Sequence, residues 1–159
     1  MIHQELIKID GDAEYYQQFR ELWHEYVADL QSKEPRVADA NDIEIYQMFQ
    51  QKDLDIYFMV IRDLVMGFCV IAKGKLKPKG VSYHISEFYV CPQYRNKGFG
   101  SWMARQIRQK YGKTVSLHVL YNNPRADVFW RRIFDDCENI SSDYDLSDDL
   151  VKGYVFKEK

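Results

Sequence analysis

Hydrophobic residues in the first third of the chain follow two different spacings. A loose alternation at 2–9 predicts a strand that ends before Gly11. A run at helical spacing then predicts a long amphipathic helix capped by Asp12. The apolar face of this helix holds Tyr15, Phe19, Leu22, Trp23, Tyr26, Val27 and Leu30. After a loop at 32–40, Asn41 and Glu44 stand three residues apart, as in a capping box, and predict the start of a short second helix.

The rest of the chain alternates between strand-like and helical segments. Apolar runs at 55–62 and 65–73 predict two strands around a tight turn, and Gly67 indicates a bulge. Further segments are strands at 81–90, 114–121 and 151–156, a helix that follows Gly100 and ends at Gly112, and a helix that begins at Pro124. The predicted order is β-α-α-β-β-β-α-β-α-β-β. This order predicts an α/β fold in which a mixed sheet carries helices on both faces.

Composition narrows the class of protein. A length of 159 residues, with 46% hydrophobic and 29% charged residues, is typical of one globular domain that spans 1–159. The net charge of −2 argues against nucleic acid or an anionic membrane as the main partner. Three cysteines without C-x-x-C spacing favour reduced thiols over a metal site or disulfides. Because 1–10 does not resemble a signal peptide and no apolar run is long enough to span a bilayer, we expect a soluble, cytoplasmic protein.

The stretch from Glu87 to Tyr111 carries the clearest chemical signal. It reads as a strand that Pro92 ends, a turn with Gly98 and Gly100, and then an amphipathic helix. A strand, a glycine turn and a helix bring free backbone N–H groups and the positive end of a helix dipole to one point. The sequence therefore predicts an anion site, for which phosphate is the usual ligand.

Two patches resemble a known family. The pattern Arg95-x-x-Gly98-x-Gly100 resembles the acyl-CoA loop of the GCN5-related N-acetyltransferases, the GNAT superfamily. The pattern Asn123-x-x-Ala126-x-x-Phe129-Trp130 resembles a second motif of that family, which ends in Phe-Tyr. Together the patches cover 83–134, whereas the first half matches only in the order of its elements. The resemblance implies a GNAT-type sheet, mixed and mostly antiparallel, flanked by helices.

The resemblance also implies acetyl-CoA as the cofactor and a primary amine as the acetyl acceptor. The acceptor is expected to be a small molecule or a protein amino group. The resemblance also leaves open whether the protein forms a homodimer. The residues implied to bind the cofactor are Phe88, Tyr89, Val90, Arg95, Asn96, Lys97, Gly98, Phe99, Gly100, Ser101, Asn123 and Trp130. A backbone N–H near Tyr89 or Val90 is expected to face the developing oxyanion. No metal is expected.

Several residues compete for the acid–base roles. Glu87 is our first candidate for the base that deprotonates the amine, followed by His118 and then His84. Strand alternation places Glu87 and Val90 on opposite faces, and a bulge near Phe88 would restore the geometry. Many relatives carry a tyrosine acid where this chain has Trp130, which cannot act as an acid. Tyr89, Tyr94 or Tyr121 could replace it.

Alternative interpretations remain at the other charged segments. The lysines at 73–79 are read as a solvated hairpin tip rather than as a phosphate-attracting loop or a nucleic-acid site. The acceptor pocket is expected between the first helix, the loop 32–41 and the last strands. The acidic segment 135–149 either attracts a cationic amine or is plain soluble surface. Trp130 also motivates a second function class, a catalytically silent module that binds acyl-CoA.

Overall fold

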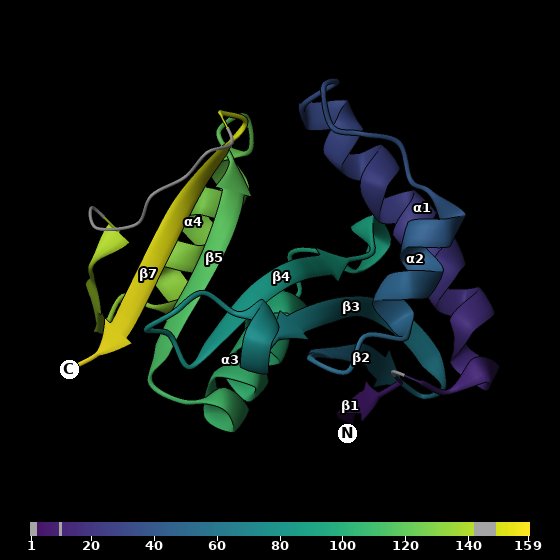
Figure 1. Cartoon of the computed structure of the whole chain (residues 1–159), viewed down its shortest axis with the longest axis horizontal. Helices are drawn as coiled ribbons and strands as arrows, with labels where there is room; N and C mark the ends of the chain where they lie inside the picture. The colour runs from purple at the N-terminus through teal and green to yellow at the C-terminus, as the bar shows by residue number, and fades with distance from the viewer. Residues whose placement is uncertain (1–2, 10, 142–148) are drawn as a thin grey trace.

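A computed structural model describes residues 3–9, 11–141 and 149–159. Its elements follow the predicted order. They are β1 (Gln4–Lys8), α1 (Ala13–Lys33), α2 (Asp42–Phe49), β2 (Leu54–Ile61), β3 (Leu64–Ala72), β4 (Tyr83–Val90), α3 (Phe99–Tyr111), β5 (Thr114–Leu120), α4 (Pro124–Ile133), β6 (Cys137–Asn139) and β7 (Val151–Glu158) (Figure 1). Short 3-10 turns at Gly74–Leu76 and Pro92–Tyr94 flank β4. The predicted helix caps form, because Asp12 accepts a bond from the backbone of Glu14 and Asn41 accepts bonds from Ile43 and Glu44.

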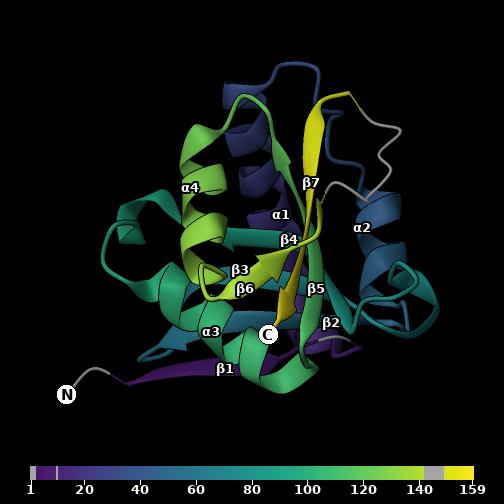
Figure 2. The same cartoon turned by 90° about the vertical axis from the view of Figure 1, so that its left-hand side faces the viewer.

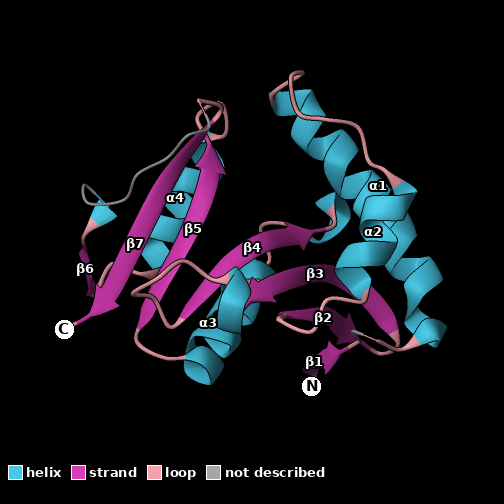
Figure 3. Ribbon diagram, in the orientation of Figure 1, coloured by secondary structure: helices cyan, strands magenta, loops and turns pink. Residues whose placement is uncertain are grey.

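The seven strands form one sheet in the order β1-β2-β3-β4-β5-β7-β6 (Figure 3). All neighbouring pairs are antiparallel except β4 and β5, which are parallel. The fold is therefore the mixed, mostly antiparallel sheet that the sequence predicts. The strand ends shift by only one or two residues.

Two hydrophobic cores cover the two faces of the sheet. On one face, α1 and α2 pack against β2, β3 and β4 through a cluster that includes Phe19, Phe49, Phe58, Phe68 and Tyr89. On the other face, residues of α3, α4, β5 and β7 form a larger cluster. In the side view α4 lies in front of α1 (Figure 2). The expected placement of helices on both faces is confirmed.

The pairing of β4 with β5 is short. Only Tyr83, His84 and Ile85 pair with Val115, Ser116 and Leu117, although β4 continues to Val90 and β5 to Leu120. Beyond these three pairs the two strands diverge, with β5 turning toward β7 and β4 toward α1 (Figure 1). We call this region the splay. Among the residues that the structure describes, no strand pairs with this backbone edge of β4 from Ser86 onward.

Two bulges shape the middle of the sheet. In β3, Met66 is skipped between the pairs Met59–Gly67 and Val60–Val65, as Gly67 indicated. A Cβ atom at Gly67 would lie 2.2 Å from the carbonyl oxygen of Tyr89, so only glycine permits the close approach of β3 to β4. In β4, the unpaired residue is Ser86, because Val70 pairs with Glu87 and Ile71 with Ile85. The bulge that was expected near Phe88 therefore lies two residues earlier.

The structure also bears on the cysteines, the acidic segment, and the expectations about membrane spans and metal sites. Cys69 and Cys91 are buried free thiols, and Cys137 is a partly buried free thiol. The acidic residues Asp143, Asp145 and Asp148 lie outside the described residues, as does Ile2 of the expected first strand. Within the described part of the chain, no helix is long and apolar enough to cross a membrane. Among the same residues, no group of His, Cys, Asp and Glu side chains is arranged to hold a metal ion.

We predict that Phe68→Ala lowers the free energy of unfolding by about 3–5 kcal/mol, because Phe68 is fully buried and its ring contacts those of Phe19, Trp23, Tyr26 and Tyr89. Chemical denaturation measures this loss. Leu64→Ala, at a side chain that is 58% exposed, is the matched control. A loss below about 1 kcal/mol for Phe68→Ala would contradict the packing described here.

Candidate active site

The glycine turn forms a cluster of backbone donors at the start of α3. Gly98 caps the helix in a left-handed conformation (φ +85°), and its carbonyl accepts the first helical bond from Trp102. The N–H groups of Phe99, Gly100 and Ser101 precede that bond and have no partner within the helix. They point out of the N-terminus, where the helix dipole favours an anion. The first turn of α3 contains no acidic side chain that would oppose one.

The free backbone edge of β4 begins next to these donors. The N–H of Cys91 donates to Met66, and the carbonyl of Tyr89 faces Gly67, so both residues direct their backbone groups toward β3. Backbone directions alternate along a strand, so those of Phe88 and Val90 face the splay. Of the two backbone N–H groups that the sequence left open, that of Val90 faces the splay and that of Tyr89 faces β3.

Side chains of β4 reverse their alternation at the Ser86 bulge. Before it, Tyr83 and Ile85 face the core formed with α3 and α4; after it, Phe88 and Val90 do. Glu87 and Tyr89 therefore face α1, and His84, which precedes the bulge, faces the same side. Because the strand is regular from Glu87 to Val90, these two residues remain on opposite faces. The bulge instead brings His84 and Glu87 to one face.

Glu87 sits in an unusual environment for a carboxylate. It is partly buried, and its Oε2 accepts a hydrogen bond from the hydroxyl of Tyr26 on α1. Burial raises the pKa of Glu87 from 4.5 to about 7, although the hydrogen bond from Tyr26 opposes that shift. At neutral pH the group can therefore both accept and release a proton, as a general base must.

The two candidate histidines lie together on β4 and β5. His84 Nδ1 is 2.7 Å from Oγ of the buried Ser116, and the rings of His84 and His118 are 5.1 Å apart. Burial, followed by the charge of His118, lowers the pKa of His84 to about 4. His84 is therefore neutral at pH 7. His118 is exposed and lies on β5 beside the splay, so it is still a candidate base.

The predicted second motif lies on α4. Asn123 caps this helix, since its Oδ1 accepts from the backbone of Ala126 at 3.3 Å. Trp130 is 5% exposed and packs edge-on against Phe88 and Phe129, with ring centroids 4.7 and 4.8 Å away. Its side chain fills the core below the splay. Tyr89 is 4% exposed, faces α1 and has a pKa raised to about 12 by burial, which makes it a weak acid.

Arg95 connects the glycine turn to α1. Its Nε donates to the carbonyl of Val90 at 2.8 Å, and its Nη2 donates to Asp29 Oδ2 at 3.0 Å. The guanidinium also lies over the ring of Tyr89, 5.6 Å from its centroid. The guanidinium of Arg95, which the family resemblance implied to bind the cofactor, is thus paired with a carboxylate of the protein. The sequence did not indicate Asp29 as its partner.

Two further contacts bear on the predicted surroundings of the site. Asn122, after β5, donates to the buried Glu34 at the end of α1 (3.1 Å), so the loop expected to border the acceptor pocket meets the β5–α4 turn. The lysines at 73–79 lie at the opposite end of β4 from the glycine turn. There Lys73 pairs with Asp55 at 2.9 Å. This placement supports their interpretation as a hairpin tip.

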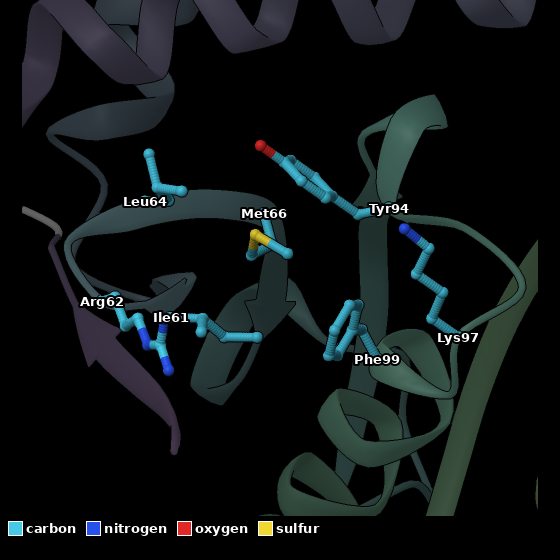
Figure 4. A pocket seen from close by; sticks show the side chains of 7 residues that line it. All are labelled: Ile61, Arg62, Leu64, Met66, Tyr94, Lys97 and Phe99. Carbon is cyan, nitrogen blue, oxygen red and sulfur yellow. The ribbon is translucent and has the colours of Figure 1, made fainter. Parts of the chain in front are cut away.

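An apolar hollow of about 340 Å³ opens on the other side of the glycine turn. Figure 4 shows its lining, which combines the β2–β3 hairpin with the turn: Ile61, Arg62, Leu64, Met66, Tyr94, Lys97 and Phe99. In the sheet order, β3 and β5 lie on opposite sides of β4. The hollow is therefore separate from the splay and from Glu87, although Lys97 and Phe99 border it.

The strands β4 and β5 thus part beside the N-terminus of α3, and Glu87 lies on the α1 face of β4. The model of the acetyltransferase (GNAT) family matches residues 15–135. The chain belongs to this family. The recognition that the two sequence patches provided is therefore confirmed.

Solved structures have the same fold. An acetyltransferase from Thermus thermophilus superposes with a TM-score of 0.73 at 9% identity, over 96% of this chain and 95% of that one. The PaiA N-acetyltransferase of Thermoplasma acidophilum, in complex with coenzyme A, gives 0.65 at 16% identity, with 98% and 99% covered. Arabidopsis thaliana NAA60, in complex with a bisubstrate analogue, gives 0.59 at 16% identity, with 97% of each chain covered. No curated protein sequence matches the chain.

The raised pKa of Glu87 predicts a pH-dependent effect on stability. Because the folded state holds this proton more tightly than the unfolded state, the wild-type chain loses stability as the pH rises from about 4.5 through about 7. Glutamine carries no charge at any pH. Glu87→Gln should therefore raise the melting temperature at pH 8 more than at pH 5, as followed by circular dichroism.

The exposed position Glu138 provides the control for this measurement, since Glu138→Gln also removes one carboxylate. Its effect on the melting temperature should be small and similar at both pH values. If Glu87→Gln behaved in the same way, the environment described for Glu87 would be wrong.

Proposed function

We propose that residues 1–159 act as one domain that transfers the acetyl group of acetyl-CoA to a primary amine of a small molecule or a protein. The observation that carries this proposal is the splay, because it opens the backbone edge of β4 next to the donors at the start of α3. Family membership supports acyl transfer. The PaiA and NAA60 structures support coenzyme A and an amine as the reactants.

The residues around the glycine turn fit a pyrophosphate. A Cβ atom at Gly100 would lie in ordinary contact with Val90 at 3.4 Å and Phe129 at 3.6 Å, so alanine fits beside the N–H donors, whereas a longer side chain would crowd them. The main-chain groups of Phe88 and the N–H of Val90 are suited to hydrogen-bond an extended amide-containing arm, whereas the Val90 carbonyl already accepts from Arg95. Phe99 to Ser101 supply donors to phosphate, Asn123 lies at the start of α4 across the splay, and Arg95 orients the turn.

Cofactor binding and deprotonation of the acceptor take place on different faces of the sheet. On the α3 and α4 side, the donors at the turn bind the cofactor, whose thioester supplies an activated acyl group. On the α1 side, Glu87 takes a proton from the ammonium group of the acceptor, so that the neutral amine can attack. The N–H of Val90 stabilises the negative charge that develops on the carbonyl oxygen, which is worth about 3 kcal/mol of barrier for one such donor.

The leaving group needs no protein acid in this scheme. As the C–N bond of the amide forms and the C–S bond of the thioester breaks, a thiol with a pKa of about 8.5 can leave as a thiolate. The proton taken up by Glu87 returns to solvent, and the second proton that the amine nitrogen loses goes to the thiolate or to solvent. The buried Trp130 is compatible with this scheme, since it contributes packing rather than a proton. The absence of a tyrosine at that position also motivates the alternative, a silent acyl-CoA-binding module. Release of free thiol from acetyl-CoA with a panel of amines distinguishes the two, because only the enzyme turns over.

Binding of the cofactor can be tested by thermal shift. Acetyl-CoA at 100 times its dissociation constant should stabilise the chain by about 2.7 kcal/mol. Gly100→Asp should abolish the shift, because it places a negative charge beside the phosphate donors. Gly100→Ala adds a side chain without charge and should keep most of the shift. An unchanged shift in a folded Gly100→Asp variant would show that the turn is not the cofactor site.

The identity of the base can be tested by kinetics. Glu87→Gln should lower kcat/KM by roughly 10²-fold or more, because general base catalysis is lost, while the affinity for coenzyme A stays nearly unchanged. His118→Asn should cost much less. A larger loss for His118→Asn would make the histidine the base. If neither substitution mattered, catalysis would rest on positioning of the reactants.

A further inference from the structure

The hydroxyl of Tyr26, on α1, donates a hydrogen bond to Oε2 of Glu87, across 61 positions of sequence. We propose that Tyr26 is a positioning residue that holds the Glu87 carboxylate in the orientation and charge state in which it accepts a proton from the amine. This inference rests on the function proposed above. It assigns a role in the reaction to a helix that the sequence patches do not cover.

Tyr26 is well placed to fix the carboxylate because its own ring is fixed. It is 8% exposed, and the rings of Trp23, Phe68 and Tyr89 each lie 5.4 Å from it. These contacts come from α1, β3 and β4, so they hold the phenol between the helix and the sheet. Its hydroxyl can reach Glu87 without a change of rotamer.

A second contact fixes the helix that carries Tyr26. Asp29, three residues further along α1, accepts from Arg95, which also donates to the carbonyl of Val90. The helix is therefore attached to β4 through Glu87 at one point and through Arg95 at another. Since Arg95 belongs to the glycine turn, α1 holds both that turn, through Asp29, and the proposed base Glu87, through Tyr26.

The hydrogen bond also favours the charged form of Glu87, against the larger effect of burial. Titratable groups on this side include Glu25, Tyr26 and Asp29 from α1, His84 and Tyr89 from β4, Cys91 just after it, His118 from β5 and Arg95 from the turn. The nearest residues of β3, Val70 and Phe68, are apolar. Burial favours the protonated acid, and the Tyr26 hydroxyl is the group that opposes it. With Oε2 taken by Tyr26, Oε1 is the oxygen that an approaching ammonium group or a water molecule can reach.

The experiment compares the pH dependence of kcat/KM in the wild type and in Tyr26→Phe, which keeps the ring and its packing. The lost hydrogen bond to a charged group should move the acid limb to higher pH by about one unit, which is about a tenfold loss of rate below the limb. The rate should recover at higher pH. In a Glu87→Gln background, Tyr26→Phe should have little further effect.

Tyr154→Phe is the matched control. Tyr154, on β7, donates its hydroxyl to the Asp127 carboxylate on α4, so the substitution removes the same kind of bond away from Glu87. Its acid limb should coincide with that of the wild type. An equal displacement in both variants would overturn the proposal, because the effect would then reflect a general loss of stability.

Carboxyl NMR titration of Glu87 gives a readout that does not depend on turnover. In Tyr26→Phe the Glu87 carboxyl should titrate at higher pH than in the wild type. An unchanged titration would overturn the proposal, and so would a changed titration with an unmoved acid limb. If the wild type released no thiol with any amine, the proposed function would fail, whereas the titration would still report whether Tyr26 controls the carboxylate.

Discussion

The loss of pairing between β4 and β5 after Ile85 is the constraint on which the site depends. Ser86 is an extra residue in β4, and it turns the strand away from β5 after only three paired residues. Strands that stayed paired would satisfy their backbone groups within the sheet and leave no edge for a ligand. Because the strands part, Phe88 and Val90 present main-chain groups to the opening. The same extra residue reverses the alternation of side chains and sends Glu87 to the α1 face.

The two cores keep this opening in place. One core packs β4 against α1 and α2 through aromatic rings, and the other packs both β4 and β5 against α3 and α4. The Arg95–Asp29 ion pair joins the glycine turn to the first core, and the Asn122–Glu34 hydrogen bond joins the end of β5 to α1. The second link crosses the opening, so the glycine turn and the end of β5 are both held in position relative to α1.

The sequence predicted the elements, their order and the glycine turn, because those features depend on local spacing and on residues such as Pro92, Gly98 and Pro124. It could not locate the bulge at Ser86, since a register shift depends on the partner strand, and serine carries no signal for it. Arg95 illustrates a second limit: its motif indicated a phosphate ligand, whereas its ion pair depends on Asp29, 66 positions away. Tyr26 had a usable signal, because a phenol at a buried helix position needs a polar partner. That this partner is Glu87 could be learned only from the fold.

Gly67 illustrates how such a site constrains the chain at a distance from any reactant. Its missing side chain lets the backbone of β3 approach the Tyr89 carbonyl, and this approach sets the line of β4. Nearly every substitution at position 67 would therefore push β4 out of line, although the residue has no chemistry to lose. In a mutational scan, position 67 would be as intolerant as the glycines of the turn. Intolerance at a buried glycine thus reports the shape of the backbone, and a scan alone would misassign it to ligand binding.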